Sequence, residues 1–302
     1  MRPLTMPSSG WCFSPRSRLG SPNWTGAKAY RTMRSGRGLA CDGADLVAAG
    51  AKIVGTHAEV ARASDVVFLC VTGSPQVEAV VAGPGGLLEG AAKGLLIADT
   101  STSEPDSTAR MREVCAAKGV DYVDAPLART PVEAEAGKLN VMVGATPEQF
   151  AKLQPLLKCF AENIFHVGGP GSGHIIKLLN NFVAQAICNA TAEAFAVGQR
   201  AGVDLKQFVA LVSAGLVNSG LFQIMSKTLD GQLDGMKFEL NNARKDVRYY
   251  THLAENLGVP TVMGEATHQS LVLACALGFG NKLVPSLVEA QEKLANVKLV
   301  PR

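Results

Sequence analysis

The chain has 302 residues, of which 47% are apolar and 18% are charged, so it is long enough for two domains with sizeable cores. Its seven cysteines are scattered without a C-x-x-C pair, and its five histidines show no metal-ligand spacing. These features argue against a disulfide framework and a metal site, and for a reducing compartment such as the cytoplasm. No run of about 18 apolar residues occurs, so we expect no membrane span.

The net charge of +3 comes from one end of the chain. The residues before Asp42 include no acid but seven bases, which are Arg2, Arg16, Arg18, Lys28, Arg31, Arg34 and Arg37. Removing these seven from the 29 basic residues leaves 22 against 26 acidic ones, so the main body is mildly acidic. Nucleic acid is not an expected partner of such a chain.

Residues 1–43 differ from everything after them. They are rich in Arg, Ser, Gly and Pro, contain both tryptophans and show neither the period of a strand nor that of a helix. We interpret them as an aberrant or disordered segment. From Asp45 onward, apolar runs alternate with helical patterns, which is typical of an α/β domain.

This α/β domain is expected over residues 44–167. Its continuous apolar runs predict buried parallel strands, and the capping boxes that begin at Thr56 and Thr146 predict helix starts. The expected strands are 65–71, 94–101, 120–127, 139–145 and 163–169, and the expected helices are 56–63, 74 to about 81, 105–118 and one that begins near 146.

Beyond Gly173 the strand signals stop, and an all-α domain is expected over residues 168–302. The expected helices are about 173–201, 204–215, 217–230, 238–256, 260–278 and 285–295. The first carries small and apolar residues nearly all round, which predicts a helix buried on most faces.

A lysine stands near the start of that helix. Lys177 lies between pairs of large aliphatic residues, and helical spacing places Asn181 and Ala184 on its face. A charged amine there must extend to water, pair with another group or take part in chemistry. Small and hydroxylic residues follow the strands of the sheet, where parallel sheets bind ligands, although such residues are also common in turns.

Four motifs occur in a fixed order: DTSTSEP (99–105), DAPLARTPVEAEAGKLNVMVGA (124–145), GGPGSGHIIKLLNN (168–181) and FELNNARKDV (238–247). In this order they resemble the β-hydroxyacid dehydrogenase family, which includes 3-hydroxyisobutyrate dehydrogenase and tartronate semialdehyde reductase. The resemblance covers residues from about 45 to about 295. It implies a Rossmann-like dinucleotide-binding domain, here incomplete, followed by a helical domain that binds substrate and dimerises.

The resemblance also implies an activity and its residues. Members of the family are oxidoreductases that transfer hydride between NAD or NADP and a short 3-hydroxy acid or its semialdehyde. Lys177 matches its general acid/base, with Asn181 as support and Asn180 and Thr130 near the substrate. Val71, Thr102 and Lys245 match residues near the cofactor. The implied partners are a small anionic hydroxy acid or aldehyde and further copies of the chain, as a homodimer or homotetramer.

The chain departs from the family pattern after the third strand. Many members carry Ser-Gly-Gly where this chain has Ala128-Arg129-Thr130, which is similar to the sulfolactaldehyde reductase branch. An arginine can bind a carboxylate or sulfonate through two hydrogen bonds, so we expect Arg129 to hold the anionic end of the substrate. Ala184 stands where that branch is expected to carry serine. The helix N-terminus at 173–175 is also expected to offer N–H groups to the anion.

A second departure concerns the cofactor. No G-x-G-x-x-G occurs in the chain, and residues 14–19, where it is expected, read Ser-Pro-Arg-Ser-Arg-Leu without an apolar strand before them. A targeting segment, true divergence and a shifted reading frame over the first 43 residues are the alternatives. The shifted frame is favoured because the odd segment replaces the missing motif at nearly equal length. The alternative function is therefore a family member that is catalytically impaired.

Overall fold

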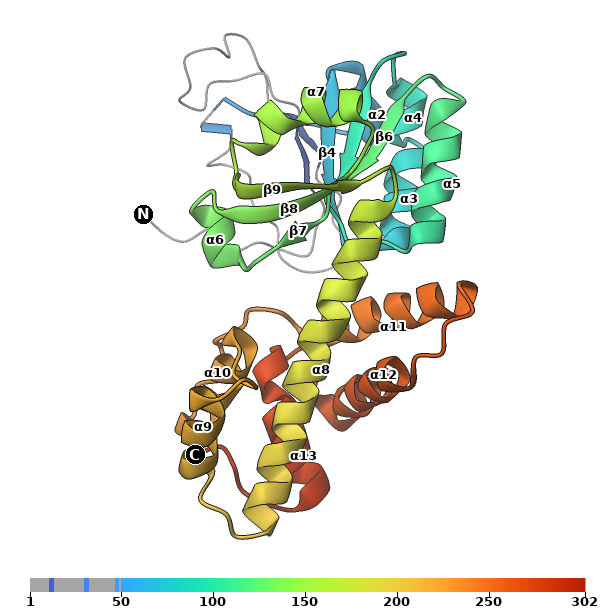
Figure 1. The fold of residues 1–302 in the computed structure, drawn as a ribbon. Coiled ribbons are helices and arrows are strands. Elements are labelled where there is room, and N and C mark those ends of the chain that lie inside the picture. The colour runs from blue at the N-terminus through green and yellow to red at the C-terminus, as the bar shows by residue number, and fades with distance from the viewer. Residues whose placement is uncertain (1–10, 14–29, 33–46, 49, 302) are drawn as a thin grey trace. The chain divides into compact units, whose positions relative to one another are not determined.

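In a computed structural model, the described residues are 11–13, 30–32, 47–48 and 50–301. The chain divides into two compact units, Met1–Lys177 and Leu178–Arg302, and the first contains the sheet (Figure 1). Most of the segment 1–43, with residues 14–19, lies outside the described residues.

The main sheet has seven strands in the order β1-β4-β5-β6-β8-β7, with β9 paired to β8. These are β1 Trp11–Phe13, β4 Val66–Cys70, β5 Leu96–Asp99, β6 Asp121–Asp124, β7 Leu127–Ala128, β8 Leu139–Gly144 and β9 Ala161–Gly168. A second sheet pairs β2 Tyr30–Thr32 with β3 Lys52–Val54 in parallel.

The predicted parallel sheet is present, but not every pair of its strands is parallel. Strands β4, β5 and β6 are parallel, as are β8 and β9, whereas β8 is antiparallel to both β6 and β7. The expected strand 120–127 is divided into β6 and β7 by Ala125 and Pro126, which belong to neither. A parallel return needs a crossover of a dozen or more residues, usually a helix. Residues 129–138, which include the five-residue α6, Pro131–Glu135, separate β7 from β8 and are too few for such a crossover.

Strand β1 is a further correction, because no apolar strand was expected before residues 14–19. It runs antiparallel to β4, with Cys12 opposite Leu69. The first strand of a dinucleotide-binding βαβ unit is parallel to its neighbours, because a crossover connects them. The strand therefore differs in direction from the one that would carry a pyrophosphate-binding turn.

Alternating side chains of the central strands form a core on each face of the sheet. Val67, Leu69 and Ile97 pack on one face, while Phe68 and Leu96 pack on the other. The first face is covered by α2 His57–Arg62, α3 Ser74–Ala82, α4 Leu87–Gly90 and α5 Pro105–Ala116, and the second by α7 Pro147–Leu157 (Figure 1). Both faces are thus buried, as the continuous apolar runs predict.

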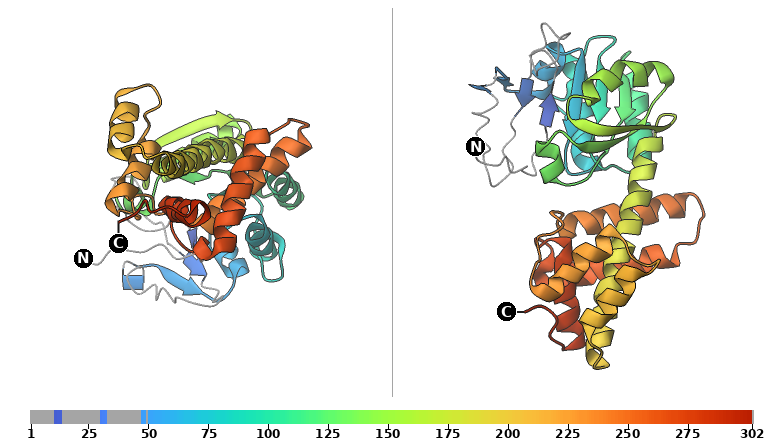
Figure 2. Two further views of the ribbon diagram at one scale, coloured as in Figure 1. Left: turned by 90° about the horizontal axis from the view of Figure 1, so that it is seen from below. Right: turned by 60° about the vertical axis from the view of Figure 1, so that its left-hand side comes forward.

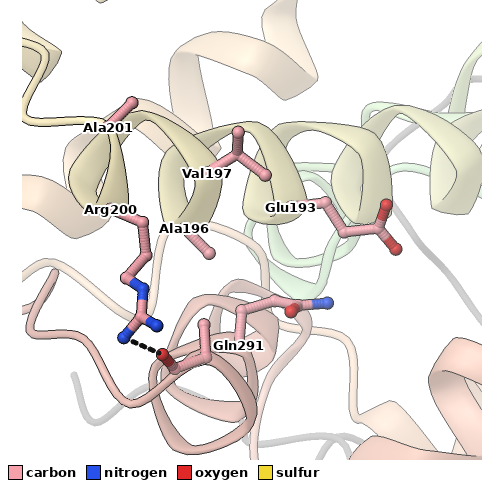
Figure 3. Close-up of a pocket in the computed structure, with 7 residues that line it drawn as sticks. Glu193, Ala196, Val197, Arg200, Ala201 and Gln291 are labelled. Atoms are coloured by element: carbon pink, nitrogen blue, oxygen red, sulfur yellow. Dashed lines mark hydrogen bonds between the residues drawn. The ribbon is translucent and has the colours of Figure 1, made fainter.

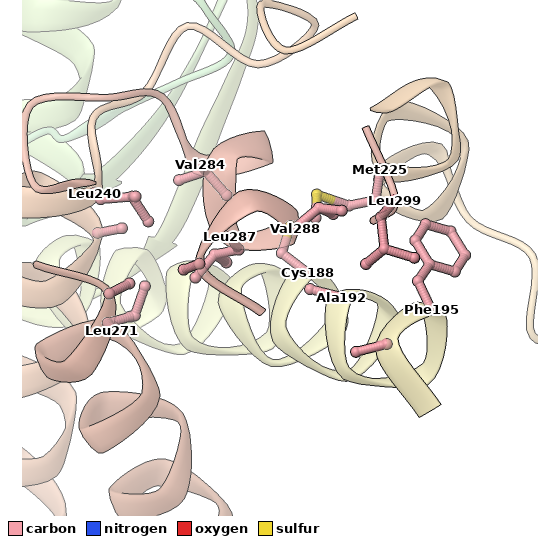
Figure 4. Close-up of a cluster of buried hydrophobic side chains, with 14 of the residues drawn as sticks. Cys188, Ala192, Phe195, Met225, Leu240, Leu271, Val284, Leu287, Val288 and Leu299 are labelled. Atoms are coloured by element: carbon pink, nitrogen blue, oxygen red, sulfur yellow. The ribbon is translucent and has the colours of Figure 1, made fainter. Parts of the chain in front are cut away.

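The second unit is helical. Its elements are α8 Ser172–Arg200, which begins in the first unit, α9 Leu205–Ala214, α10 Gly220–Ser226, η1 Lys227–Asp230, α11 Leu240–Asn256, α12 Val262–Ala274, η2 Cys275–Phe279, η3 Val284–Ser286 and α13 Leu287–Ala295. Their core packs against one side of α8, where Cys188, Ala192 and Phe195 meet Met225 of α10 and Leu287 of α13 (Figure 4). Figure 2 shows these helices from two further sides.

The expectation that α8 is buried on most faces is wrong for the single chain. Its buried residues recur at helical spacing along one stripe, whereas Ile176, Leu179, Val183 and Val197 are between 38% and 69% exposed. The core of the helical unit contacts only one side of α8, which leaves an apolar face uncovered.

Among the described residues, no helix is both long and apolar enough to cross a membrane. The same residues contain no group of three or more His, Cys, Asp or Glu side chains that could hold a metal ion.

Candidate active site

The first turn of α8 lies directly on the sheet because of two glycines, one just before the helix and one in its first turn. A Cβ on Gly173 would lie 2.6 Å from the carbonyl oxygen of Met142 and 2.8 Å from that of Asp124. Gly171 has φ +95°, in the left-handed region that favours glycine. The G-x-G pattern therefore lets the helix start against the ends of β6 and β8.

Asp124, which is fully buried, caps this turn. Its Oδ1 accepts a hydrogen bond from the N–H of Gly171 at 2.7 Å, and its Oδ2 accepts one from the N–H of His174 at 3.0 Å. The N–H of Ile175 donates to the Gly171 carbonyl at 3.4 Å. The expectation that residues 173–175 offer free N–H groups to a substrate anion is thus wrong for His174 and Ile175, because the protein's own carboxylate and first turn accept them.

Lys177 and Asn181 follow on α8, one turn apart. Both are buried, with 9% and 7% of their surfaces exposed. Asn181 Nδ2 donates to Asp246 Oδ2 of α11 at 2.6 Å, and its Oδ1 accepts from Asn180 Nδ2 at 3.1 Å. The Asn181 amide is therefore fixed at both ends.

Lys245 belongs to the same cluster. Its Nζ lies 2.9 Å from Asp246 Oδ1, an ion-pair distance without hydrogen-bond geometry, and 5.2 Å from the centre of the Tyr249 ring. Asp246 is 2% exposed and joins Lys245 to Asn181. Three of the predicted residues, Asn180, Asn181 and Lys245, are thus brought together around a carboxylate for which the sequence suggested no role.

Val71 and Thr102 stand at the ends of neighbouring strands in the sheet unit. The N–H of Val71 donates to Ser101 Oγ at 2.9 Å, and the N–H of Ser101 donates to Asp99 Oδ1 at 2.9 Å. This chain of bonds fixes the loops after β4 and β5 to each other. Helix α3 starts beside them with Gly73 as its N-cap and no side-chain cap.

Arg129 and Thr130 lie in the loop after β7, and both already have partners. Arg129 has φ +79°, donates to the Lys138 carbonyl at 2.6 Å and forms an ion pair with Glu162 of β9. Thr130 caps α6 and donates to Glu133 Oε2 at 2.6 Å. This hydroxyl, the Thr130 N–H and the Arg129 charge lower the pKa of the Glu133 carboxyl.

A buried polar group below the first turn of α8 was not predicted from the sequence. Tyr122 donates to Asp99 Oδ2 at 2.7 Å, and His174 Nδ1 lies 2.7 Å from Thr108 Oγ1. Burial, and then the Asp99 charge, raise the pKa of Tyr122 well above its usual value. The signal was present: two of the predicted strands are followed by or include an aspartate, and a histidine stands three residues before Lys177.

The helical unit also has a shallow hollow between α8 and α13 (Figure 3). It is lined by Glu193, Ala196, Val197, Arg200, Ala201, Gln291 and Ala295. Arg200 donates to the Ala295 carbonyl at 3.3 Å. The hollow begins 16 residues beyond Lys177 on α8, which is about 24 Å along the helix, so it is separate from the cluster around Asn181.

Comparisons with known proteins identify the family. A sequence model described as the NAD binding domain of 6-phosphogluconate dehydrogenase matches residues 41–168. One described as NAD-binding of NADP-dependent 3-hydroxyisobutyrate dehydrogenase matches residues 171–288. The 2-(hydroxymethyl)glutarate dehydrogenase of Eubacterium barkeri is 31% identical over 258 residues, 85% of either chain. The chain belongs to the 3-hydroxyisobutyrate dehydrogenase family.

Further members of the family are similar to this chain in sequence or in fold. The 2-hydroxy-3-oxopropionate reductase of Escherichia coli (strain K12) is 31% identical over 84% of this chain and 87% of its own. A crystal structure of 3-hydroxyisobutyrate dehydrogenase from Salmonella typhimurium, 24% identical, has the same fold, with a TM-score of 0.70 over 82% of this chain and 86% of that one. The predicted family, fold class, enzyme class and NAD(P) cofactor are thereby confirmed. The chain is an NAD(P)-dependent oxidoreductase of the 3-hydroxyacid dehydrogenase and semialdehyde reductase kind.

The residues of the chain fit this cofactor only in part. The ends of β4 and β5 present small and hydroxylic residues beside the uncapped N-terminus of α3, which suits the close approach of a nucleotide. The first 40 residues lie outside both matched ranges, and the sequence contains no G-x-G-x-x-G for the pyrophosphate.

Proposed function

We propose that the chain oxidises a short 3-hydroxy acid, or reduces its semialdehyde, with Lys177 as general acid/base. The observation that supports this is the burial of Lys177 one turn before Asn181, whose amide is held by Asp246. Burial of an amine in general disfavours its ammonium form, so that more of it is present as the free amine that can accept a proton. General acid/base help of this kind is typically worth about 10² to 10⁴ in rate.

In this mechanism the nicotinamide, when bound, supplies or accepts the hydride. Lys177 Nζ takes the proton of the substrate hydroxyl during oxidation and returns it during reduction. Asn181 orients the amine or the substrate oxygen, because its own amide cannot rotate without losing the bond to Asp246. Val71 and Thr102 would contact the cofactor from the ends of β4 and β5, and Lys245 from α11.

The substrate class is proposed from Arg129 and Thr130. Relatives are named for 2-(hydroxymethyl)glutarate, 2-hydroxy-3-oxopropionate and 3-sulfolactaldehyde, all of which are anionic. Arg129 has five N–H donors, and among the described residues only its Nη1 has partners, which are Glu162 and the Lys138 carbonyl. The remaining donors can bind a carboxylate or sulfonate, while Thr130 and Asn180 supply further polar contacts.

The test is a kinetic screen with both cofactors. Wild type and Lys177→Met would be assayed with 3-hydroxyisobutyrate, glycerate, sulfolactaldehyde and 4-hydroxybutyrate. Lys177→Met is expected to lose about 10²-fold or more in kcat on every substrate used. Lys206→Met, which changes an exposed lysine of α9, is the matched control and should retain full activity. Undiminished kcat in Lys177→Met would refute the assignment.

A catalytically impaired chain is the second candidate, and two observations favour it. The sequence lacks the glycine-rich turn, and β1 is antiparallel to β4. Titration with NADH and NADPH distinguishes the two: saturable micromolar binding supports the enzyme, and no binding up to millimolar concentration supports the impaired chain.

We also propose that the chain self-associates, as the apolar face of α8 with Ile176, Leu179, Val183 and Val197 suggests. Light scattering should then give the mass of a dimer or tetramer. A cytoplasmic location, expected from the cysteines, stays a prediction.

A further inference from the structure

A cluster of buried polar side chains lies beneath the first turn of α8. Its member on that helix, His174, stands three residues before Lys177. Its members come from α5, β5, β6 and α8, and each is at most 2% exposed. They are Asp99, Thr108, Tyr122, Asp124 and His174. The mechanism proposed above uses none of them, although buried polar side chains are costly unless they are paired.

The imidazole of His174 is the member that joins α8 to the rest of the cluster. Its Nδ1 lies 2.7 Å from Thr108 Oγ1, and its Nε2 lies 3.7 Å from Asp99 Oδ2 without a hydrogen-bond partner among the described residues. Thr108 Oγ1 also lies 3.1 Å from the Glu104 carbonyl. A hydroxyl has one proton, so when it donates to that carbonyl, Nδ1–H must donate to the hydroxyl oxygen.

Asp124 alone does not fix the helix. It binds two backbone N–H groups at the N-terminus, and a helix held at one end can still rotate about its axis. The bond between His174 and Thr108 is a second attachment, made by a side chain that points sideways to α5. Residues at i and i+3 lie on one helix face, so the rotation that places His174 also places Lys177.

We propose that His174 is a positioning residue for Lys177, acting through its Nδ1 bond to Thr108. The inference rests on the proposed function of Lys177 as general acid/base. A displacement of about 1 Å at a reacting group can cost on the order of 10²-fold in rate, so the attachment matters for kcat more than for substrate binding.

The variants that test this role are chosen from the two nitrogens of the His174 ring and from its partner Thr108. His174→Leu removes both nitrogens at similar volume, whereas His174→Asn keeps a polar atom near the position of Nδ1 and can still pair with Thr108. Thr108→Val removes the other partner of the same bond. His166→Leu is the matched control, because His166 lies in the same unit, stacks on Phe150 and bonds to the Ala145 carbonyl, and neither partner belongs to α8.

Kinetics give the first readout. His174→Leu and Thr108→Val are each expected to lower kcat by about tenfold to 10²-fold, with KM within about threefold of wild type. His174→Asn should recover most of the loss, and the double variant His174→Leu/Thr108→Val should lose no more than either single one. Equal kcat in wild type and Thr108→Val would overturn the proposal, as would additive losses in the double variant.

The second readout is the Lys177 amine itself, in protein without cofactor. Lysines would be reductively methylated with ¹³C-formaldehyde, and the Lys177 signal assigned by its absence in Lys177→Arg. The signal should shift in His174→Leu and Thr108→Val and remain in place in His166→Leu. An unshifted signal in both variants overturns the proposal. If Lys177→Met keeps full kcat, the function of Lys177 has failed instead, which separates the two outcomes.

Discussion

At the scale of single residues, buried carboxylates organise the polar contacts of both units. Asp99, Asp124 and Asp246 are each at most 2% exposed, and each has donors from a different element of the fold. An ionised carboxylate in a protein interior is costly unless such donors surround it. The bonds that compensate this cost therefore also fix α8 against the sheet and Asn181 against α11.

Buried thiols make the free energy of unfolding depend on pH in the alkaline range. Burial raises the pKa of Cys115 on α5 and that of Cys188 on α8 from 9.0 to about 12. Above pH 9 the unfolded chain releases these protons and the folded chain does not. The free energy of unfolding should therefore fall between pH 9 and pH 12, by up to about 1.4 kcal/mol per pH unit for each thiol.

Urea denaturation at pH 8, 9 and 10 measures this slope. Cys188→Ala should show a shallower decline than wild type above pH 9, even though the substitution lowers stability at every pH by leaving a cavity. Cys159→Ala, at an exposed cysteine, is the control with an unchanged slope. Parallel curves for wild type and Cys188→Ala would contradict the assignment.

At the scale of elements, the sequence predicted those whose signals are local. The expected helix 173–201 is Ser172–Arg200, and both capping boxes occur where Thr56 and Thr146 predict them. The direction of β8 was missed because it depends on pairing between distant segments, which apolar runs do not encode. The role of Asp246 was missed for the same reason, since Asn181 is 65 residues away.

The loop after β7 holds a residue in an unfavourable backbone conformation. Arg129 has φ +79°, which costs a non-glycine residue about 1–2 kcal/mol. Arg129→Gly relieves this cost but loses an ion pair that is largely exposed and worth about 0–1 kcal/mol. Arg129→Ala loses the same ion pair and keeps the conformation. Arg129→Gly should thus be the more stable variant by about 1 kcal/mol, as measured by urea denaturation.

Both variants should raise KM for anionic substrates, because the guanidinium is gone, and should leave kcat little changed. Glu162→Gln keeps Arg129 and removes the negative charge of its ion-pair partner. Its KM for anionic substrates should therefore be equal to or lower than that of wild type. An unchanged KM in Arg129→Ala for every acid substrate would exclude Arg129 as the anion-binding residue.

At the scale of the whole molecule, the chain combines a helical unit that matches the family with a sheet unit whose beginning is unusual. The family match starts at residue 41, the preceding residues are basic without any acid, and β1 runs opposite to β4. A pyrophosphate-binding turn needs a parallel strand, a helix N-terminus and glycines that let backbone N–H groups approach the phosphates. Residues 14–19, where the sequence pattern places this turn, include Pro15 and two arginines and no glycine.

The shifted reading frame makes a prediction about the coding DNA. Translation of the first 43 codons in another frame should give an apolar strand followed by G-x-G-x-x-G, in register with Asp45. If neither alternative frame contains that motif, the segment is true divergence or a targeting sequence.

We call the protein whose first 43 residues come from the frame with the glycine motif the restored chain. It should bind NADH and NADPH more tightly than the present chain. Fluorescence titration with NADH and NADPH is expected to give a micromolar Kd for the restored chain and at least tenfold weaker binding for this one, because backbone N–H groups at the turn are the main donors to the pyrophosphate. Replacing the second glycine of the restored motif by valine should abolish the gain, since a side chain there keeps the backbone away from the phosphates. Equal affinity of the restored and present chains would mean that the ends of β4 and β5 suffice to hold the nucleotide.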